Sequence, residues 1–267
     1  MHMKIIQQQF RFAILLNGMT SEIQDLSIVQ KFLLFSKHRG FREAVVVSLQ
    51  KLFFPLFKFY HSHFKRSTFL FDGFSYPYLV HNYNVTWISE RAVEIPIFLA
   101  QMAKIRSEGL AALEIGNVLS HYEADLPAGW TIVDKYERAP GVVNEDISHF
   151  IPNKKYKYIV SVSTMEHVGF DEEEKDSEKI IRVVTQVQEK LLDTGGSFIF
   201  SVPIGFNAEL DKKLFGHIIK YSQIKFLKRT GSMIWEDCGQ EDVLGAKYNS
   251  PYAGGNALAV VYMQKQL

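Results

Sequence analysis

The chain has 267 residues, of which 47% are hydrophobic, and its formal net charge at pH 7 is +1. This length suits one large domain, or one domain with an extension, and the near-zero charge excludes a global field that attracts nucleic acid. The single cysteine, Cys238, excludes an internal disulfide and favours a reducing compartment, so we expect a cytoplasmic protein.

Residues 1–66 differ in composition from the rest and are expected to form a helical extension. Residues 27–66 carry eight Lys or Arg side chains against one acidic residue, Glu43, with aromatic side chains interleaved. Apolar residues recur at helical spacing over 41–52, and Pro55 is expected to end or kink this helix. Two interpretations stay open: the helix packs its apolar face on the main domain, or it makes peripheral contact with an anionic membrane surface or a partner.

No targeting segment or membrane span is expected. The apolar piece at residues 10–16 is short and lacks the small-residue cleavage site of a signal peptide. The longest apolar stretch, residues 44–59, contains Lys51, Pro55 and Lys58, whereas a span needs about twenty mostly apolar residues.

Residues 67–267 are expected to form the main domain, with an α/β core from about residue 105. A helix is expected over 90–104, which Pro96 can break. Further on, the expected strands lie at 110–115, 130–134, 157–163, 197–203, 224–228 and 257–264, and the expected helices at 118–126, 172–192 and 207–221. Such alternation implies a parallel sheet with helices on both faces, and the last two strands are expected to form a terminal hairpin.

The first of these strands ends in Glu114, Gly116 follows it, and Asp134 closes the next strand. This pattern suits a nucleoside-like cofactor, because the carboxylate accepts hydrogen bonds from ribose hydroxyls and the glycine lets the backbone approach the ligand. The loop 116–121 has one glycine and so lacks those that cradle a pyrophosphate. S-adenosylmethionine has a ribose and an adenine but no phosphate, and it tolerates such a loop better. An ordinary strand–turn–helix with a buried glycine is the alternative.

Five segments, in order, resemble motifs of the class I S-adenosylmethionine-dependent methyltransferases. They are residues 113–116, Asp134, residues 144–147, residues 158–168 and residues 191–203. The resemblance implies a doubly wound, seven-stranded, mostly parallel sheet with a terminal antiparallel hairpin, after an N-terminal helical extension, and S-adenosylmethionine as cofactor. Val118 departs from the family, because it stands where the first motif usually has a second glycine.

The resemblance implies cofactor-binding roles at the carboxyl ends of the predicted strands, where ligands sit in doubly wound sheets. Asp134 would accept from two neighbouring ribose hydroxyls, and Asp146 with Ile147 would bind and cover adenine. Simpler alternatives are a turn or cap role for each aspartate and a hydrogen-bonded strand-end acid for Glu114. The expected cofactor-binding set is Glu114, Gly116, Asn117, Asp134, Lys135, Asp146, Ile147 and Ser163.

Methyl transfer needs little covalent help, because in-line positioning supplies most of the rate. A hydroxyl or amine acceptor still has to lose a proton, and His167 is the expected catalytic base. Glu166 and Asp171 are expected to orient it. A purely structural histidine is the alternative.

Four residues are expected at the substrate or in a lid. Tyr83, Trp87 and Arg91 precede the first core strand and would close over the cofactor, excluding water. Asn207 follows the last parallel strand and would touch the acceptor. Ordinary packing is the alternative for all four.

The sequence therefore predicts a methyltransferase that uses S-adenosylmethionine and acts on a small-molecule or carbohydrate-like acceptor, without a nucleic acid partner. No metal is expected, because His61 and His63 have no third ligand nearby in sequence. The alternative is a non-catalytic binding or scaffold protein, docked to a membrane or partner through residues 27–66. A nicotinamide-dependent reductase is disfavoured by the missing glycines.

Overall fold

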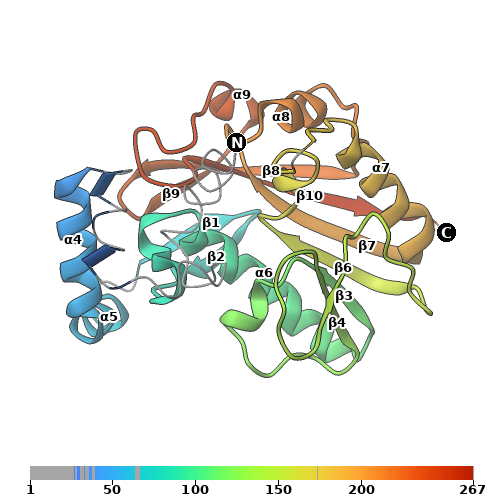
Figure 1. The fold of residues 1–267 in the computed structure, drawn as a ribbon, viewed down its shortest axis with the longest axis horizontal. Helices are drawn as coiled ribbons and strands as arrows, with labels where there is room; N and C mark the ends of the chain where they lie inside the picture. The colour runs from blue at the N-terminus through green and yellow to red at the C-terminus, as the bar shows by residue number, and fades with distance from the viewer. Residues whose placement is uncertain are drawn as a thin grey trace.

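The computed structural model describes residues 27, 29–30, 33, 36–37, 40–63, 67–172 and 174–266. Its centre is an eight-stranded sheet in the order β5-β4-β3-β6-β7-β10-β8-β9 (Figure 1). The strands are β3 (Ala112–Ile115), β4 (Trp130–Asp134), β5 (Val142–Asn144), β6 (Tyr156–Val162), β7 (Leu192–Pro203), β8 (Gln223–Gly231), β9 (Ile234–Cys238) and β10 (Ala257–Gln264).

The predicted mostly parallel sheet with an antiparallel end is confirmed. The strands from β5 to β7 pair in parallel. Strand β10 pairs antiparallel with β7 and with β8. The sheet has one strand more than predicted, because β9 adds to the edge as a hairpin with β8. Strand β9 was not predicted because it contains the acidic residues Glu236 and Asp237, and acidic residues are depleted in strands.

The strand order reverses between β3 and β6. From β3 the chain adds β4 and β5 on one side, and then crosses to β6 and β7 on the other side. In open α/β sheets the ligand crevice lies at such a switch point, outside the carboxyl ends of the strands. A ligand site is therefore expected at the residues that follow Ile115 and Val162.

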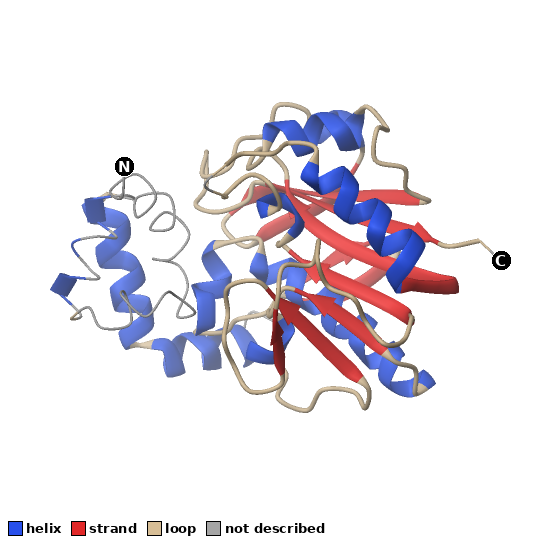
Figure 2. Ribbon diagram, turned by 45° about the vertical axis from the view of Figure 1, so that its right-hand side comes forward, coloured by secondary structure: helices blue, strands red, loops and turns tan. Residues whose placement is uncertain are grey.

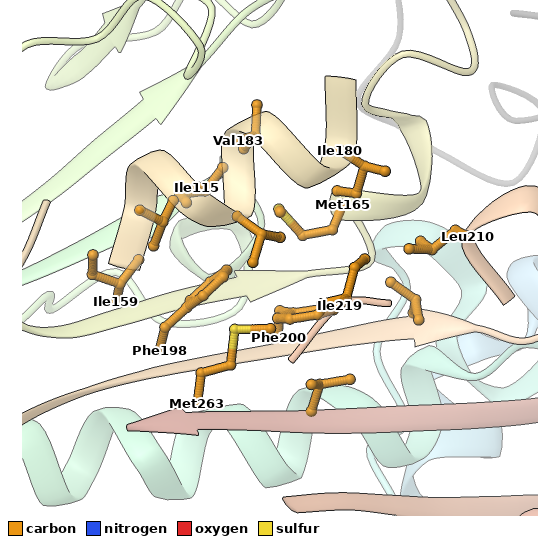
Figure 3. Close-up of a cluster of buried hydrophobic side chains, with 14 of the residues drawn as sticks. Ile115, Ile159, Met165, Ile180, Val183, Phe198, Phe200, Leu210, Ile219 and Met263 are labelled. Atoms are coloured by element: carbon orange, nitrogen blue, oxygen red, sulfur yellow. The ribbon is translucent and has the colours of Figure 1, made fainter. Parts of the chain in front are cut away.

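Both faces of the sheet are covered (Figure 2). Helix α7 (Lys179–Gln186), which continues as a π turn (Val187–Leu191), and helix α8 (Ala208–Phe215) lie over one face. Figure 3 shows the core on this face, where Ile180 and Val183 of α7 belong to the same buried cluster as Phe198 and Phe200 of β7. Because side chains alternate along a strand, the intervening Ile199 belongs to the core on the other face.

Helix α6 (Arg91–Glu108) and the hairpin of β1 (Thr68–Phe71) and β2 (Phe74–Pro77) cover that other face. The break expected at Pro96 does not occur. Proline cannot donate to the carbonyl one turn before it, here that of Ala92. This carbonyl instead accepts a hydrogen bond from the N–H of Leu79 at 2.9 Å, so the missing helical bond is replaced.

Three predicted helices are shorter in the structure. Only a 3-10 turn (Leu119–His121) forms within 118–126. Helix α7 starts late because the preceding loop closes on Gly169, whose carbonyl accepts from the N–H of Asp176. Helix α8 ends at Phe215, just before His217, which has a left-handed φ of 52°. A further single helical turn, α9 (Gln240–Val243), lies between β9 and β10.

Near the N-terminus, helix α4 (Phe41–Leu52) covers the predicted segment, and α5 (Phe54–His63) begins next to Pro55. Part of this helix pair packs on the main domain. Phe54 stacks on Trp87 with ring centroids 5.5 Å apart, and Ala44 is buried in the same cluster. None of the helices in the described ranges is long and apolar enough to span a membrane.

Candidate functional site

The loop after β3 is organised by the buried carboxylate of Glu114. Its Oε1 accepts hydrogen bonds from the N–H groups of Val118 at 2.9 Å and Leu119 at 2.8 Å, and its Oε2 accepts from Trp130 Nε1 at 3.0 Å. Burial raises the pKa of Glu114 to about 7, although these hydrogen bonds oppose the shift. Glu114 is therefore the hydrogen-bonded strand-end acid that the sequence offered as the simpler alternative, and it anchors the turn after β3.

Gly116 follows β3 and lies close to Thr164, which follows β6. Its φ is +86°, a left-handed value that favours glycine. A Cβ at this position would lie 2.2 Å from Oγ1 of Thr164, the second residue after β6. Only glycine therefore lets the loop pass so close to Thr164, and the two strand ends meet at the switch point.

Asp134, at the end of β4, is fixed by backbone donors. Its Oδ2 accepts from the N–H of Asn117 at 2.9 Å, and its Oδ1 accepts from Tyr136 at 2.8 Å and Glu137 at 2.7 Å. An ionised carboxylate has about four lone-pair positions, so these three bonds leave about one for a ligand. Oδ2 of Asp134 therefore has one acceptor position left, where the prediction expected the carboxylate to accept from two hydroxyls. Asn117 itself donates to Glu137 through its side chain.

Lys135 and Asp146 belong to a four-membered charge cluster. Asp146 Oδ2 lies 3.0 Å from Lys135 Nζ and 2.7 Å from Lys179 Nζ, and both lysines also contact Glu172. Burial works against ionisation of Asp146, but its hydrogen bonds with Lys179, Ser148 and Lys135 hold its pKa below the usual range. Both carboxylate oxygens of Asp146, which were expected to accept from adenine, therefore already bind Ser148 and the two lysines.

Ile147 differs from its expected role as a cover for adenine. Its side chain is 7% exposed and packs in the core beneath α7. The direction of one apolar side chain after a short strand is set by packing, and the sequence motif carries no such information.

Ser163 follows β6 with a left-handed φ of 38°. Its hydroxyl donates to Oε1 of Glu94, and so does the hydroxyl of Ser201 on β7, both at 2.5 Å. Arg91 Nη1 donates to the other oxygen of Glu94 at 2.9 Å. Burial raises the pKa of Glu94, while the positive charge of Arg91 opposes this. Ser163 and Arg91 therefore lie at the site, joined through a glutamate of α6.

The two predicted catalytic residues lie on the 3-10 turn Met165–His167. His167 Nδ1 pairs with Asp171, and its Nε2 lies 3.6 Å from Glu166 Oε1. Glu166 is 1% exposed, and neither of its carboxyl oxygens has a hydrogen-bond partner among the described residues. Burial raises the pKa of Glu166 well above its usual value, and the nearby Glu94 adds to the effect. The expected grouping of Glu166, His167 and Asp171 is present.

Of the other lid and substrate candidates, Tyr83 and Asn207 lie at this edge, and Trp87 does not. Tyr83 stacks on His121 with centroids 4.4 Å apart, and His121 pairs with Glu137. Trp87 packs in the separate cluster with Phe54 of α5. Asn207 is buried and caps α8 by accepting from the N–H groups of Glu209 and Leu210, while its side-chain amide donates to the carbonyl of Glu166.

Sequence reasoning missed Glu90, Glu94 and Thr164. Glu90 lies before α6, is 4% exposed and accepts from the N–H of Gly255 at 2.6 Å, just ahead of β10. For the two glutamates, the available signal was a pair of acids four residues apart beside the apolar run 95–100, since buried acids need specific partners. In the described part of the chain, no group of three or more His, Cys, Asp or Glu side chains is arranged to hold a metal ion.

No family model matches the sequence, and no curated protein matches it. Among solved structures, it is similar to the N-methyltransferase NodS from Bradyrhizobium japonicum in complex with S-adenosylhomocysteine, at 10% identity over 62% of this chain and 84% of that chain, with a TM-score of 0.40. A sugar N-methyltransferase from Streptoalloteichus is 11% identical over 66% of this chain and 88% of its own, with a TM-score of 0.35. A "possible exported protein" from Bordetella parapertussis is 9% identical over 100% of this chain and 97% of its own, with a TM-score of 0.39. At such identities and TM-scores we draw no functional conclusion from these likenesses.

Proposed function

We propose that the chain is an S-adenosylmethionine-dependent methyltransferase acting on a small or carbohydrate-like acceptor. One observation carries this proposal: two carboxylates take the N–H groups of the loop after β3. Asp134 accepts from Asn117, and Glu114 accepts from the next two residues, Val118 and Leu119. These backbone donors are the ones that would cradle a phosphate. Because these N–H groups are already bonded within the chain, the loop does not offer them to a pyrophosphate.

The same carboxylates suit S-adenosylmethionine, which has a ribose, a positively charged sulfonium and an ammonium group but no phosphate. The remaining acceptor position on Asp134 Oδ2 fits one ribose hydroxyl. Gly116 allows close approach of the ligand to the backbone beside Thr164. When bound, the cofactor supplies an activated methyl group, and the protein has mainly to position the acceptor in line with it.

The residues after β6 are placed to move a proton away from the acceptor. Glu166 is the buried acceptor of the proton, His167 Nε2 lies 3.6 Å from its Oε1, and Asp171 pairs with His167 Nδ1. The chain of groups leads outward, because His167 and Asp171 are partly exposed. Tyr83 and His121 provide a stacked aromatic wall at the same edge, which motivates the small or carbohydrate-like acceptor.

The acidic edge also disfavours a nucleic acid partner, because phosphate backbones need neutralising cations. A cytoplasmic location remains part of the proposal, on the ground of the single cysteine.

A thermal-shift titration compares S-adenosylhomocysteine with NADH on the same protein. We expect the first ligand to raise the unfolding temperature with concentration, since binding at one hundred times Kd stabilises the folded state by about 2.7 kcal/mol. We expect NADH to leave the unfolding temperature unchanged. The opposite result would favour the reductase over the methyltransferase.

A second candidate is a scaffold protein docked to an anionic membrane, and the surface of α4 and α5 favours it. Exposed apolar side chains on and between these helices include Val46, Leu49, Leu52, Phe53 and Leu56. Arg42 and Lys58 lie on the same two helices. Flotation with phosphatidylserine vesicles tests this candidate on the full chain. We expect Leu52→Glu with Leu56→Glu to abolish flotation, and undiminished flotation of that variant would rule out this surface.

A further inference from the structure

Three buried carboxyl groups meet at the carboxyl ends of β6 and β7. Glu94 contacts Ser163 and Ser201, which lie at the ends of those strands. Glu90 contacts Gly255, just before β10, whose first residues lie at the same edge because β10 runs antiparallel to β7. Glu166 lies four residues after the end of β6, on the 3-10 turn Met165–His167. All three side chains are 4% exposed or less.

Arg91 is the cation of this group. It is 5% exposed and pairs with Glu94. It also interacts electrostatically with Glu90 and Glu166. One guanidinium balances only one of the three carboxylates, so a fully ionised cluster would carry a surplus of two negative charges. A buried charge is costly unless it is paired, so this cluster needs either protons, as the raised pKa values of Glu94 and Glu166 indicate, or a further positive charge.

Unsatisfied buried hydrogen-bond acceptors in this cluster also indicate a missing donor. Both carboxyl oxygens of Glu166 lack a donor among the described residues, and so does Oδ1 of the buried Asn84. Asn84 lies beside Tyr122, which in turn interacts with Arg91 and Glu94. Leaving a buried acceptor unsatisfied costs about 1–3 kcal/mol, and such groups in native structures need an explanation. What the edge lacks is a donor that also carries positive charge.

We propose that Glu90, Glu94 and Glu166 form a binding site for an ammonium group of the methyl acceptor, so that the enzyme acts on an amine. This inference rests on the proposed methyltransferase function. A primary ammonium has three N–H donors and one positive charge. A hydroxyl would supply one donor and leave the surplus negative charge in place. The site borders the cofactor loop, because Thr164, two residues before Glu166, lies against Gly116.

Glu166 and His167 can take up the proton that an ammonium group must lose before methyl transfer. The positive charge of the bound ammonium favours ionisation of Glu166, whose own proton leaves through His167; ionised Glu166 then takes one proton from the ammonium, which becomes a neutral amine. Its lone pair attacks the methyl carbon of S-adenosylmethionine, the carbon–sulfur bond breaks with its electrons going to sulfur, and the products are a thioether and a methylated ammonium. The proton on Glu166 leaves through His167, whose Nε2 lies 3.6 Å away. The raised pKa of Glu166 suits a group that takes a proton from nitrogen.

Calorimetry with S-adenosylhomocysteine tests the proposal, in the presence of methylammonium chloride or of potassium chloride at equal ionic strength. Methylammonium is a small probe that needs no knowledge of the rest of the acceptor. In the wild type we expect it to tighten S-adenosylhomocysteine binding at least threefold over potassium, because the two ligands fill adjoining sites. The Glu166→Gln variant should bind S-adenosylhomocysteine but show no tightening, and Glu189→Gln, at an exposed position, should behave as wild type.

Other outcomes would distinguish a failure of the proposed function from a failure of the ammonium site. If S-adenosylhomocysteine does not bind to the wild type, the proposed function itself fails. If it binds but methylammonium has no effect, or acts equally on Glu166→Gln, the ammonium site is overturned. Sinefungin, which carries an amine where the cofactor has its methylated sulfur, identifies the other source of positive charge. A preference for sinefungin over S-adenosylhomocysteine without any methylammonium effect would assign the carboxyl groups to the cofactor and overturn the amine acceptor.

Discussion

The hydroxyl of Ser163 donates a 2.5 Å hydrogen bond to Oε1 of Glu94, although the two residues are 69 positions apart in the sequence. The bond ties the start of α6 to the end of β6, and Ser201 on β7 donates to the same oxygen. Because a buried carboxyl group is costly without partners, these hydroxyls and Arg91 allow Glu94 to stay at the carboxyl edge of the sheet. The geometry of that edge therefore depends on them.

Replacing Ser163 by alanine is expected to lower the free energy of unfolding by about 1–3 kcal/mol, because it removes a donor from a buried carboxyl group. Urea unfolding measures the change. Ser107→Ala is the matched control, since the hydroxyl of Ser107 donates at an exposed position on α6, the helix that holds Glu94. Equal unfolding midpoints for the two variants would show that the bond to Glu94 does not stabilise the fold.

The close approach of Gly116 to Thr164 predicts a graded series. Gly109→Ala should cost about 1–2 kcal/mol, because alanine is strained at its φ of +65° but no atom lies within 4 Å of the new Cβ. Gly116→Ala should cost about 1–3 kcal/mol more, because its Cβ also meets Thr164. Adding Thr164→Ala should recover part of that difference. If Gly116→Ala and Gly109→Ala cost the same, the contact with Thr164 is unimportant.

The pKa of Glu114 predicts a pH dependence of stability. The carboxyl group keeps its proton up to about pH 7 in the folded protein but loses it near its ordinary value of 4.5 in the unfolded chain. Its contribution is therefore fully present below pH 4.5 and is lost as the pH rises through about 7. Relative to Glu114→Gln, the free energy of unfolding of the wild type should fall by up to about 3 kcal/mol between pH 4 and pH 8.

Urea titrations of both proteins across this pH range give the difference directly. Glu189→Gln serves as the exposed control and should run parallel to the wild type. A constant difference between wild type and Glu114→Gln at all pH values would contradict the raised pKa.

The strands were the most predictable part of the fold. The predicted segments 130–134 and 257–264 coincide with β4 and β10, because each is an apolar run bounded by turns. The predicted helix over 118–126 was wrong for a tertiary reason. Glu114 takes the N–H groups of Val118 and Leu119, and only one 3-10 turn follows.

The site was predictable where it depends on strand ends, and not where it depends on contacts between distant segments. Gly116 and Asp134 lie at the switch-point edge, as their positions after adjacent strands indicate. Glu94 was missed because its partner Ser163 comes from a remote segment. The stacking of Trp87 on Phe54 of α5 agrees with the packing alternative, but the sequence could not identify this partner because the contact is equally non-local.

We propose that the edge beyond β3 and β4 binds S-adenosylmethionine through Asp134. The most direct measurement is calorimetric titration of S-adenosylhomocysteine into the wild type, Asp134→Asn and Asp125→Asn, whose aspartate is exposed. Losing one charged acceptor of a ribose hydroxyl costs about 1.5–3 kcal/mol, so we predict binding to the wild type and to Asp125→Asn, and at least tenfold weaker binding to Asp134→Asn. Equal affinity of all three proteins, or no binding to the wild type, would contradict the claim.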